Sequence, residues 1–442
     1  FTFMLGGFAA IIEKGGGLQA LVKVFLYKGR DPSKRVQLSG FILGVVCFFD
    51  GLANSMMVGR MLRSLADQCG VSRVKMAYIV DSTSSAVACL AFVSTWIAYQ
   101  LGMIREGYAQ LGLENQVQPY ALFFRSIPYN FYCWFTIVLL PVAIYKNFNP
   151  GPMKKYEMEA RTNSVKTKFN SVEDNIHWAV AVIPVFILLI SIFLGMYLNG
   201  AKCLYPVTFK GIADAFGNAN SALVLVCASA VASLAAFLCF PKRVGQEVPS
   251  KIYLEGMQSL FLPILILIGA WVLASTLEDL KAAEVLSLLL TGRFPVFLLP
   301  TTVFLIGALI SFSTGSSWGT MGILMPLSIP VAITITGSSS GQYQELILAT
   351  VVAAVFSGAV FGDHCSPISD TTIVASISCE VEPHDHVRTQ LPYALIAAII
   401  TIAIGFVPVG LGIPIWVLLL MGTLIIWITP DLLSRFKKIK DQ

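Results

Sequence analysis

Charged side chains are scarce in this sequence of 442 residues. Asp, Glu, Lys and Arg make up 12% of the chain, whereas soluble domains carry roughly 25%. Hydrophobic residues reach 56% and come in long blocks instead of amphipathic stripes. Lipid accepts only helices or closed barrels, and these blocks are too long for barrel strands. The sequence therefore predicts an all-α polytopic membrane protein, and its partner is the lipid bilayer of a cell membrane.

Signals for metal, redox or nucleic-acid chemistry are also lacking. The nine cysteines are an odd number, and no pair has the spacing of a zinc or redox motif, so we expect most, Cys365 included, to pack in the core. The net charge of +5 comes from Lys and Arg between apolar blocks and requires no nucleic acid. We expect no cofactor.

The apolar blocks predict both complete and interrupted membrane spans. Phe1 lies inside an apolar run, so we expect the chain to begin within a helix and at least one helix to precede it. The clearest spans are 77–100, 129–145, 177–199, 219–240, 252–275, 391–409 and 411–429. Polar or glycine-rich stretches interrupt four further segments, 1–26, 36–61, 294–336 and 346–378.

Basic residues predict how the chain crosses the membrane. Five clusters occur, at 28–35, 60–75, 146–175, 242–251 and 435–440. All five lie in the cytoplasm, as basic loops usually do, only if 36–59 and 294–336 each enter and leave on one side. These two segments are therefore predicted to be re-entrant hairpins, which are tolerated where they are buried in protein or line water. The C-terminus is then cytoplasmic.

The two halves of the chain resemble each other. "FDGLANSMMVG" (49–59) can be laid on "FSTGSSWGTMG" (312–322) without a gap. Downstream of each we expect a span broken by an acidic, hydroxyl-rich stretch, "DSTSSAVA" from Asp81 and "DHCSPISD" from Asp363. Paired interrupted segments in halves of opposite orientation are typical of secondary transporters with inverted repeats. The expected organisation is a first repeat, a basic linker, a second repeat and C-terminal helices with a basic tail, at 1–145, 146–176, 177–379 and 380–442. In this alignment Ala88 takes the position of Asp370, so the two ion half-sites need not be equivalent.

Four aspartates lie within or beside the breaks. An ionised carboxylate inside the bilayer costs several kcal/mol and is usually functional. Asp81 and Asp363 have apolar residues on both sides. The alternative to a functional carboxylate is one that only caps a helix at the membrane surface. This alternative has more weight for Asp50 and Asp370 than for Asp81 and Asp363.

Hydroxyl groups around these aspartates fit a cation site. Na⁺ prefers oxygen ligands, and such ligands come from Ser313, Thr314, Ser316 and Ser317 around Gly315, and from Ser366, Ser369 and Thr371 beside Pro367. Small residues also let membrane helices pack closely, which is the role expected for Ser84, Ser85, Ser311 and Ser376. His364 is a proton shuttle or a hydrogen-bonding spacer. His384 and His386 are expected to be solvated.

At these residues the chain resembles a known family. "STGSSWGTMGI" (313–323) and "FGDHCSPISDTT" (361–372) are similar to hallmark segments of the NhaC-type Na⁺/H⁺ antiporter family, within the ion transporter superfamily. The resemblance implies two inverted-topology repeats, each with a re-entrant hairpin and a broken transmembrane helix. It implies an ion and substrate site lined by Asp363, Ser366, Ser369, Asp370, Ser313, Thr314, Ser316 and Ser317, with Asp50, Asn54, Asp81, Ser82 and Thr83 as first-repeat partners.

Three functions remain open from the sequence. The first is Na⁺/H⁺ antiport, in which Asp363 and Asp370 hold Na⁺ or H⁺ in turn. The second is Na⁺- or H⁺-coupled transport of a small organic acid or amino acid, for example malate/lactate exchange, which the family motifs do not separate from the first. The third, a remote alternative, is an intramembrane aspartyl protease with Asp81 and Asp363 as the catalytic pair. The transporter readings predict no enzyme activity, and a homodimer is left open.

Overall fold

The computed structural model describes most of the chain. The described ranges are 2–17, 31–48, 51–91, 94–113, 118–163, 176–201, 219–241, 248–258, 294–337 and 339–440, with a few single residues between them. Throughout these ranges the regular structure is helical. The expected all-α polytopic architecture is confirmed.

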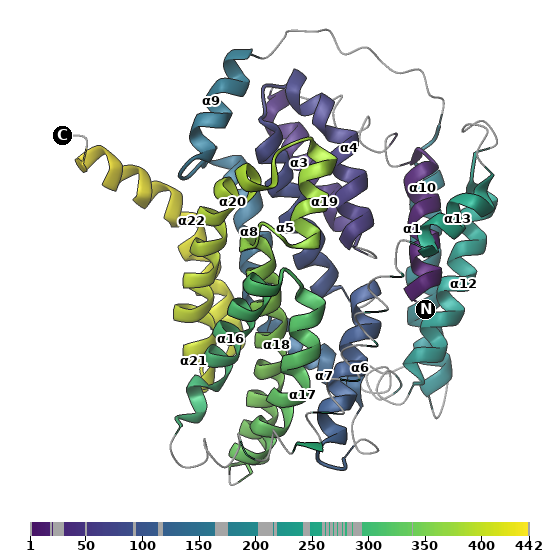
Figure 1. Ribbon diagram of the computed structural model, residues 1–442, viewed down its shortest axis with the longest axis vertical. Coiled ribbons are helices and arrows are strands. Elements are labelled where there is room, and N and C mark those ends of the chain that lie inside the picture. Colours follow the sequence, from purple (N-terminus) through teal and green to yellow (C-terminus); the bar gives the residue numbers. More distant parts are fainter. Residues whose placement is uncertain are drawn as a thin grey trace.

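A helical hairpin followed by a broken helix occurs twice. The first copy consists of α3 (Pro32–Val46), α4 (Gly51–Gln68), α5 (Arg73–Leu90) and α6 (Thr95–Ala109). The second consists of η2 (Val296–Leu298), α16 (Leu299–Thr314), α17 (Ser317–Ile335), α18 (Gly341–Cys365) and α19 (Asp370–Cys379). The hairpin α3–α4 lies toward the end of the molecule that carries α9, and α16–α17 lies toward the opposite end (Figure 1).

The two copies interlock through their hairpins. Within each copy the hairpin packs on the helix before the break, α4 on α5 and α16 on α18. Between copies each hairpin packs on the helix after the other break, α4 on α19 and α17 on α6. This crossed packing brings both breaks to the middle of the protein.

The other helices surround this centre. They are α7 (Pro119–Ser126), η1 (Ile127–Tyr129), α8 (Phe131–Tyr145), α9 (Met153–Asn163), α20 (Pro383–Ile400), the π-helical turn η3 (Thr401–Phe406), α21 (Val407–Gly410) and α22 (Ile415–Lys440). Helices α8 and α20 contact each other, α5 and α18. A side bundle contains α1 (Thr2–Lys14), α10 (Ala179–Gly200), α12 (Ser221–Cys239) and α13 (Pro249–Gln258) (Figure 1).

Helix α18 forms the core of the protein. Among the described residues six helices are long and apolar enough to cross a membrane, or seven if the bent pair 119–129 and 131–145 is one span. In the most apolar 18-residue stretch of α18, 83% of the residues are buried, whereas in that of α22 only 22% are buried. Glycines permit the tight packing of α18 on α16, because a Cβ on Gly358 would lie 2.5 Å from the Phe304 carbonyl oxygen.

Most predicted spans match helices, with one clear correction. The span predicted at 77–100 is not continuous, because it breaks between α5 and α6. The hydroxyl-rich stretch from Asp81 to Ala88, where the break was expected, is regular helix, and its Ser84 and Ser85 hydroxyls donate to the Asp81 carbonyl of the same helix. Most of 252–275 lies outside the described residues. The domain boundaries stay predictions.

Several basic residues form ion pairs at one end of the molecule. Arg63 and Arg73 both pair with Glu380, which follows α19. Lys146, at the end of α8, pairs with Asp431 of α22. This is the end that also carries α9 (Figure 1).

Candidate functional site

Asp363 lies at the end of α18, where the second broken helix stops. Its carboxylate is fully buried. One oxygen accepts a hydrogen bond from the Ser369 hydroxyl, and the other accepts from the Thr371 hydroxyl at 2.8 Å. The chain leaves the helix at Ser366 in an extended conformation beside Pro367, which cannot donate a helical hydrogen bond, and helix α19 begins after Ser369. The break therefore folds its own hydroxyl groups back onto the carboxylate.

Two further oxygen-bearing residues lie at this break. Asp370 is partly buried, and its Oδ1 accepts from the Thr371 amide at 2.8 Å, as suits an acidic residue at a helix N-terminus. The Ser366 hydroxyl is fully buried and has no partner in the described structure.

Asp81 contributes a second buried carboxylate, from α5 of the first copy. Its Oδ2 accepts from Gln390 Nε2 at 2.7 Å and lies 3.2 Å from His386 Nε2 and 3.5 Å from the Thr372 hydroxyl. Its Oδ1 has no partner in the described structure. The expectation that His386 is solvated is wrong: it is fully buried, because its face of α20 packs against α5. His384, in contrast, is exposed.

Thr372 and Gln390 join the two carboxylates into one polar layer. The Thr372 hydroxyl, near Asp81, also lies 3.1 Å from the Asp363 carbonyl oxygen. Gln390 Nε2, which donates to Asp81, also donates to the His364 carbonyl at 3.0 Å. The polar layer thus links both copies to α20.

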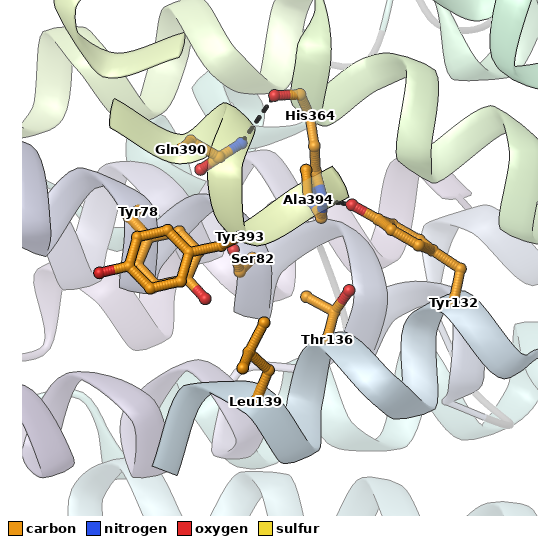
Figure 2. A pocket seen from close by; sticks show the side chains of 9 residues that line it. All are labelled: Tyr78, Ser82, Tyr132, Thr136, Leu139, His364, Gln390, Tyr393 and Ala394. Carbon is orange, nitrogen blue, oxygen red and sulfur yellow. Dashed lines mark hydrogen bonds between the residues drawn. The ribbon is translucent and has the colours of Figure 1, made fainter. Parts of the chain in front are cut away.

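A narrow pocket lies beside this layer, between α5, α8, α18 and α20 (Figure 2). His364 reaches it from α18, and its Nδ1 lies 2.9 Å from the Tyr132 hydroxyl of α8. The lining residues are Tyr78, Ser82, Tyr132, Thr136, Leu139, His364, Gln390, Tyr393 and Ala394. In this conformation the pocket leaves no room for a water molecule.

The tip of the second hairpin touches the second break. Gly315 ends α16 in the left-handed conformation, and a Cβ there would lie 2.7 Å from the Ile368 carbonyl oxygen. The Ser316 hydroxyl caps α17 by accepting from the Gly319 amide at 3.0 Å. The Ser317 hydroxyl is buried without a partner in the described structure.

Two hydroxyls of this tip point back to their own helix. Ser313 and Thr314 are exposed, and they donate to the carbonyls of Leu309 and Ile310 at 2.7 and 2.8 Å. They do not join Asp363 in this conformation. Ser311 instead donates to the Ala359 carbonyl at 2.7 Å and holds α16 on α18, the packing role expected of it.

The first-copy residues are more dispersed. Asn54 is buried on α4 and donates to the Gly44 carbonyl of α3 at 2.8 Å. Thr83 donates to the Ile79 carbonyl at 2.8 Å and packs against Gly44. Ser82 lines the pocket. Asp50 lies outside the described residues.

At each break a serine lies directly before the second helix, and its hydroxyl donates back to a residue near the end of the first helix. Ser94, before α6, donates to the Ala88 carbonyl at 2.8 Å, and Ser369, before α19, donates to the Asp363 carboxylate. Ala88 and Asp363 each stand two residues before the last residue of their helix. Counted from the helix ends, Ala88 takes the place of Asp363, whereas the alignment that starts from Asp81 pairs it with Asp370.

The polar layer does not have the composition of a transition-metal centre. Within the described ranges no group of three or more His, Cys, Asp or Glu side chains could hold a metal ion. Asp81 and Asp363 are each bonded to their own donors, and no hydrogen bond joins their carboxylates in the described structure. The paired carboxylates that an aspartyl protease requires are not seen.

Sequence reasoning missed the α20 side of the site. His386, Gln390 and Tyr393 occur at helical spacing on one face, a signal that a polar stripe in an apolar span is buried. Tyr132 and Thr372 carried no such signal, because their roles depend on which helices meet.

Comparison with known proteins places the chain in a family. The model of the Na⁺/H⁺ antiporter family matches residues 87–411. An uncharacterized protein of Haemophilus influenzae is 32% identical over 417 residues, which cover 93% of this chain and 78% of that protein. The malate-2H⁺/Na⁺-lactate antiporter of Bacillus subtilis is 39% identical over 115 residues, 26% of this chain and 22% of that protein.

Solved structures support the fold. The YdaH transporter of Alcanivorax borkumensis matches with a TM-score of 0.60 and 14% identity over 94% of this chain and 85% of that chain. At this identity the likeness concerns the fold alone. The resemblance drawn from 313–323 and 361–372 is confirmed by the family match.

Proposed function

The chain belongs to the Na⁺/H⁺ antiporter family, and on this premise we propose that it is a secondary transporter that exchanges Na⁺ for H⁺. We further propose that it works in the plasma membrane with its basic end, and hence its C-terminus, in the cytoplasm. The clustering of Arg63, Arg73 and Lys146 at one end supports this orientation, because basic residues are retained on the cytoplasmic side.

Asp363 is the proposed Na⁺ ligand, and the observation that carries the proposal is its buried carboxylate among hydroxyls. Ser369 and Thr371 donate to its two oxygens, and the buried Ser366 hydroxyl is close in sequence and unpartnered in the described structure. Hydroxyl groups can rotate so that their lone pairs face a cation. A carboxylate with several hydroxyl oxygens is the ligand set that Na⁺ prefers. Asp370, at the start of α19, adds negative charge beside it.

The same carboxylate can take a proton in place of Na⁺. A bare anion buried away from water is costly, so Asp363 is stable when a cation or a proton neutralises it. Only one of the two fits between the carboxylate and its hydroxyl donors. Mutually exclusive occupancy of one group is sufficient for exchange.

The second hairpin and the second break are proposed to move as one body. Gly315 contacts Ile368 at the tip, and α16 packs on α18 along its length. Such a unit can carry Asp363 past the helices α8 and α20 that surround it. This motion would expose the site to one side of the membrane at a time.

Reconstituted vesicles test the proposal. Protein in proteoliposomes containing a pH-sensitive dye receives a pulse of Na⁺, and H⁺ efflux is recorded. Asp363→Asn keeps the shape of the side chain and removes its charge, so we expect it to abolish the flux. Asp431→Asn, at an exposed aspartate of α22, is the matched control and should behave as wild type.

Two results would refute this function. Full exchange by Asp363→Asn would remove the ion site from this position. Flux that requires malate, lactate or an amino acid in addition to Na⁺ would instead assign the chain to coupled transport of an organic solute, the class to which the Bacillus subtilis relative belongs by name.

A further inference from the structure

Lys75 is buried in an unusual environment. It lies in the first turn of α5, is 1% exposed, and its Nζ donates to the Tyr393 hydroxyl at 2.7 Å and to the Phe148 carbonyl at 3.4 Å. Its Nζ also lies over the rings of Tyr78 and Tyr393, 5.2 and 4.6 Å from their centroids. Within the described residues no carboxylate lies at ion-pair distance. A buried ammonium without an ion pair costs several kcal/mol, so an apolar side chain would serve a purely structural role better.

The pocket beneath Lys75 contains polar atoms that lack partners. Five of its lining residues each have a buried side-chain oxygen or nitrogen with no hydrogen-bond partner in the described structure: Tyr78, Ser82, Thr136, His364 and Gln390. Each such atom costs about 1–3 kcal/mol. Hydroxyl, amide and imidazole groups together offer donors and acceptors, which is the environment that holds water in proteins. We infer that the pocket hydrates when it widens.

The pocket connects the basic end to the polar layer. At its outer end Tyr393 donates to the Phe148 carbonyl at 2.8 Å, in the half-buried loop that follows α8. At its inner end Gln390 donates to Asp81 at 2.7 Å. Neither Gly315 nor Ile368, which join the second hairpin to the second break, lines it.

We propose that protons reach the carboxylates through Lys75 and this pocket, by a route that does not pass the tip of the second hairpin beside the proposed Na⁺ site. The inference depends on the Na⁺/H⁺ exchange proposed above. In each transfer the Tyr393 hydroxyl first turns from the Phe148 carbonyl toward the pocket, and the Lys75 ammonium then gives a proton to the phenol oxygen while the phenol proton passes to water in the pocket. The neutral amine then takes a proton from solvent at the basic end, so only protons change place.

Three titratable groups face Lys75. Tyr393 and Tyr78 stack on each other at 4.0 Å between ring centroids, on α20 and α5. Glu157 of α9 acts on Lys75 through its charge, while its Oε1 accepts from the Ser72 amide at 2.8 Å and from the Ser72 hydroxyl at 2.7 Å. Any pH dependence of the route has to be attributed among these groups and Lys75 itself.

Lys75→Met tests the route, because methionine fills a similar volume without a proton. We expect Na⁺-driven H⁺ flux in proteoliposomes to fall about 10-fold or more. The rise in melting temperature that Na⁺ gives the detergent-solubilised protein should be unchanged, because the Na⁺ ligands are untouched. Lys146→Met is the matched control, since Lys146 also contacts an aromatic ring, that of Trp427, at the same end but outside the pocket. It should exchange as wild type.

Tyr393→Phe covers the case in which Lys75→Met fails to fold. It keeps the ring that stacks on Tyr78 and removes only the hydroxyl, and we expect the same selective loss of H⁺ flux. Wild-type flux in either folded variant overturns the inference. Loss of the Na⁺-dependent stabilisation together with the flux also overturns it, because that result indicates a structural role. If the wild-type protein itself shows neither Na⁺-driven flux nor Na⁺-dependent stabilisation, the proposed exchange fails instead.

Discussion

Gly362 provides the sharpest test of how α16 and α18 pack. A Cβ added to Gly362 would lie 2.5 Å from the Ala308 carbonyl oxygen and 2.7 Å from the Phe312 nitrogen, both backbone atoms of α16. Backbone atoms cannot rotate away, so Gly362→Ala has to push the two helices apart. Overpacking of this kind costs about 1–3 kcal/mol. Alanine recovers up to about 1 kcal/mol because it favours a helix over glycine.

The net expectation is a loss of about 1–2 kcal/mol in the free energy of unfolding, measured by denaturant unfolding in detergent. Gly341→Ala is the matched control on the same helix, because a Cβ there meets nothing within 4 Å. It should leave stability unchanged or raise it slightly. If Gly362→Ala is as stable as Gly341→Ala, the packing described here is wrong. Because Gly362 precedes Asp363, we also expect reduced exchange.

Further predictions concern the proposed ion site, helix α9, the basic end, and the second hairpin with the second break. Thr371→Val removes the hydroxyl that donates to Asp363 and should raise the Na⁺ concentration for half-maximal exchange about 10-fold; an unchanged value would exclude Thr371 from the site. Glu157→Ala leaves the buried Ser72 amide and hydroxyl without their acceptor and should cost about 2 kcal/mol of unfolding free energy, and wild-type stability would contradict this. Glu380→Gln weakens two half-exposed ion pairs, so its cost should stay below about 1 kcal/mol and shrink in high salt; a larger, salt-independent loss would refute that account. A disulfide engineered between α16 and α18 should leave exchange intact, whereas loss of exchange on oxidation, restored by reductant, would show that the two helices move separately.

Much of the architecture could be predicted from the sequence, because helices and their ends depend on local chemistry. Gly315 ends α16 in the left-handed conformation and Pro367 cannot donate a helical hydrogen bond, and each stands in a cluster of hydroxyl residues within an apolar block, so the second hairpin and the second break could be predicted from the sequence. Long apolar runs predict helices for the same local reason. The break after α5 carries no proline, and in the hydroxyl-rich stretch before it Ser84 and Ser85 donate to the Asp81 carbonyl of their own helix. The position of that break was therefore misjudged.

The polar layer depends on contacts between distant segments. Asp363 was predicted from its burial within a break, and its donors Ser369 and Thr371 are close in sequence. Asp81 was predicted too, but its partners His386 and Gln390 lie in α20, and no local pattern specifies which helix α20 packs on. Hydroxyl content alone also overestimates a site, because a serine in a helix can bond to its own backbone, as Ser313 does.

The hydrogen bonds at Ala88 and Asp363 show how the two copies differ at equivalent places and suggest a substitution that would make them more alike. In one copy the Ser369 hydroxyl donates to the carboxylate of Asp363, whereas in the other the Ser94 hydroxyl donates to the main-chain carbonyl of Ala88, whose side chain is only a methyl group. The two copies therefore present different chemical groups at equivalent places in their breaks, although Asp81 gives the first copy a buried carboxylate elsewhere. The substitution Ala88→Asp would show whether Ser94 can also bind a carboxylate. A positive result would give the first copy a buried acidic group like that of Asp363.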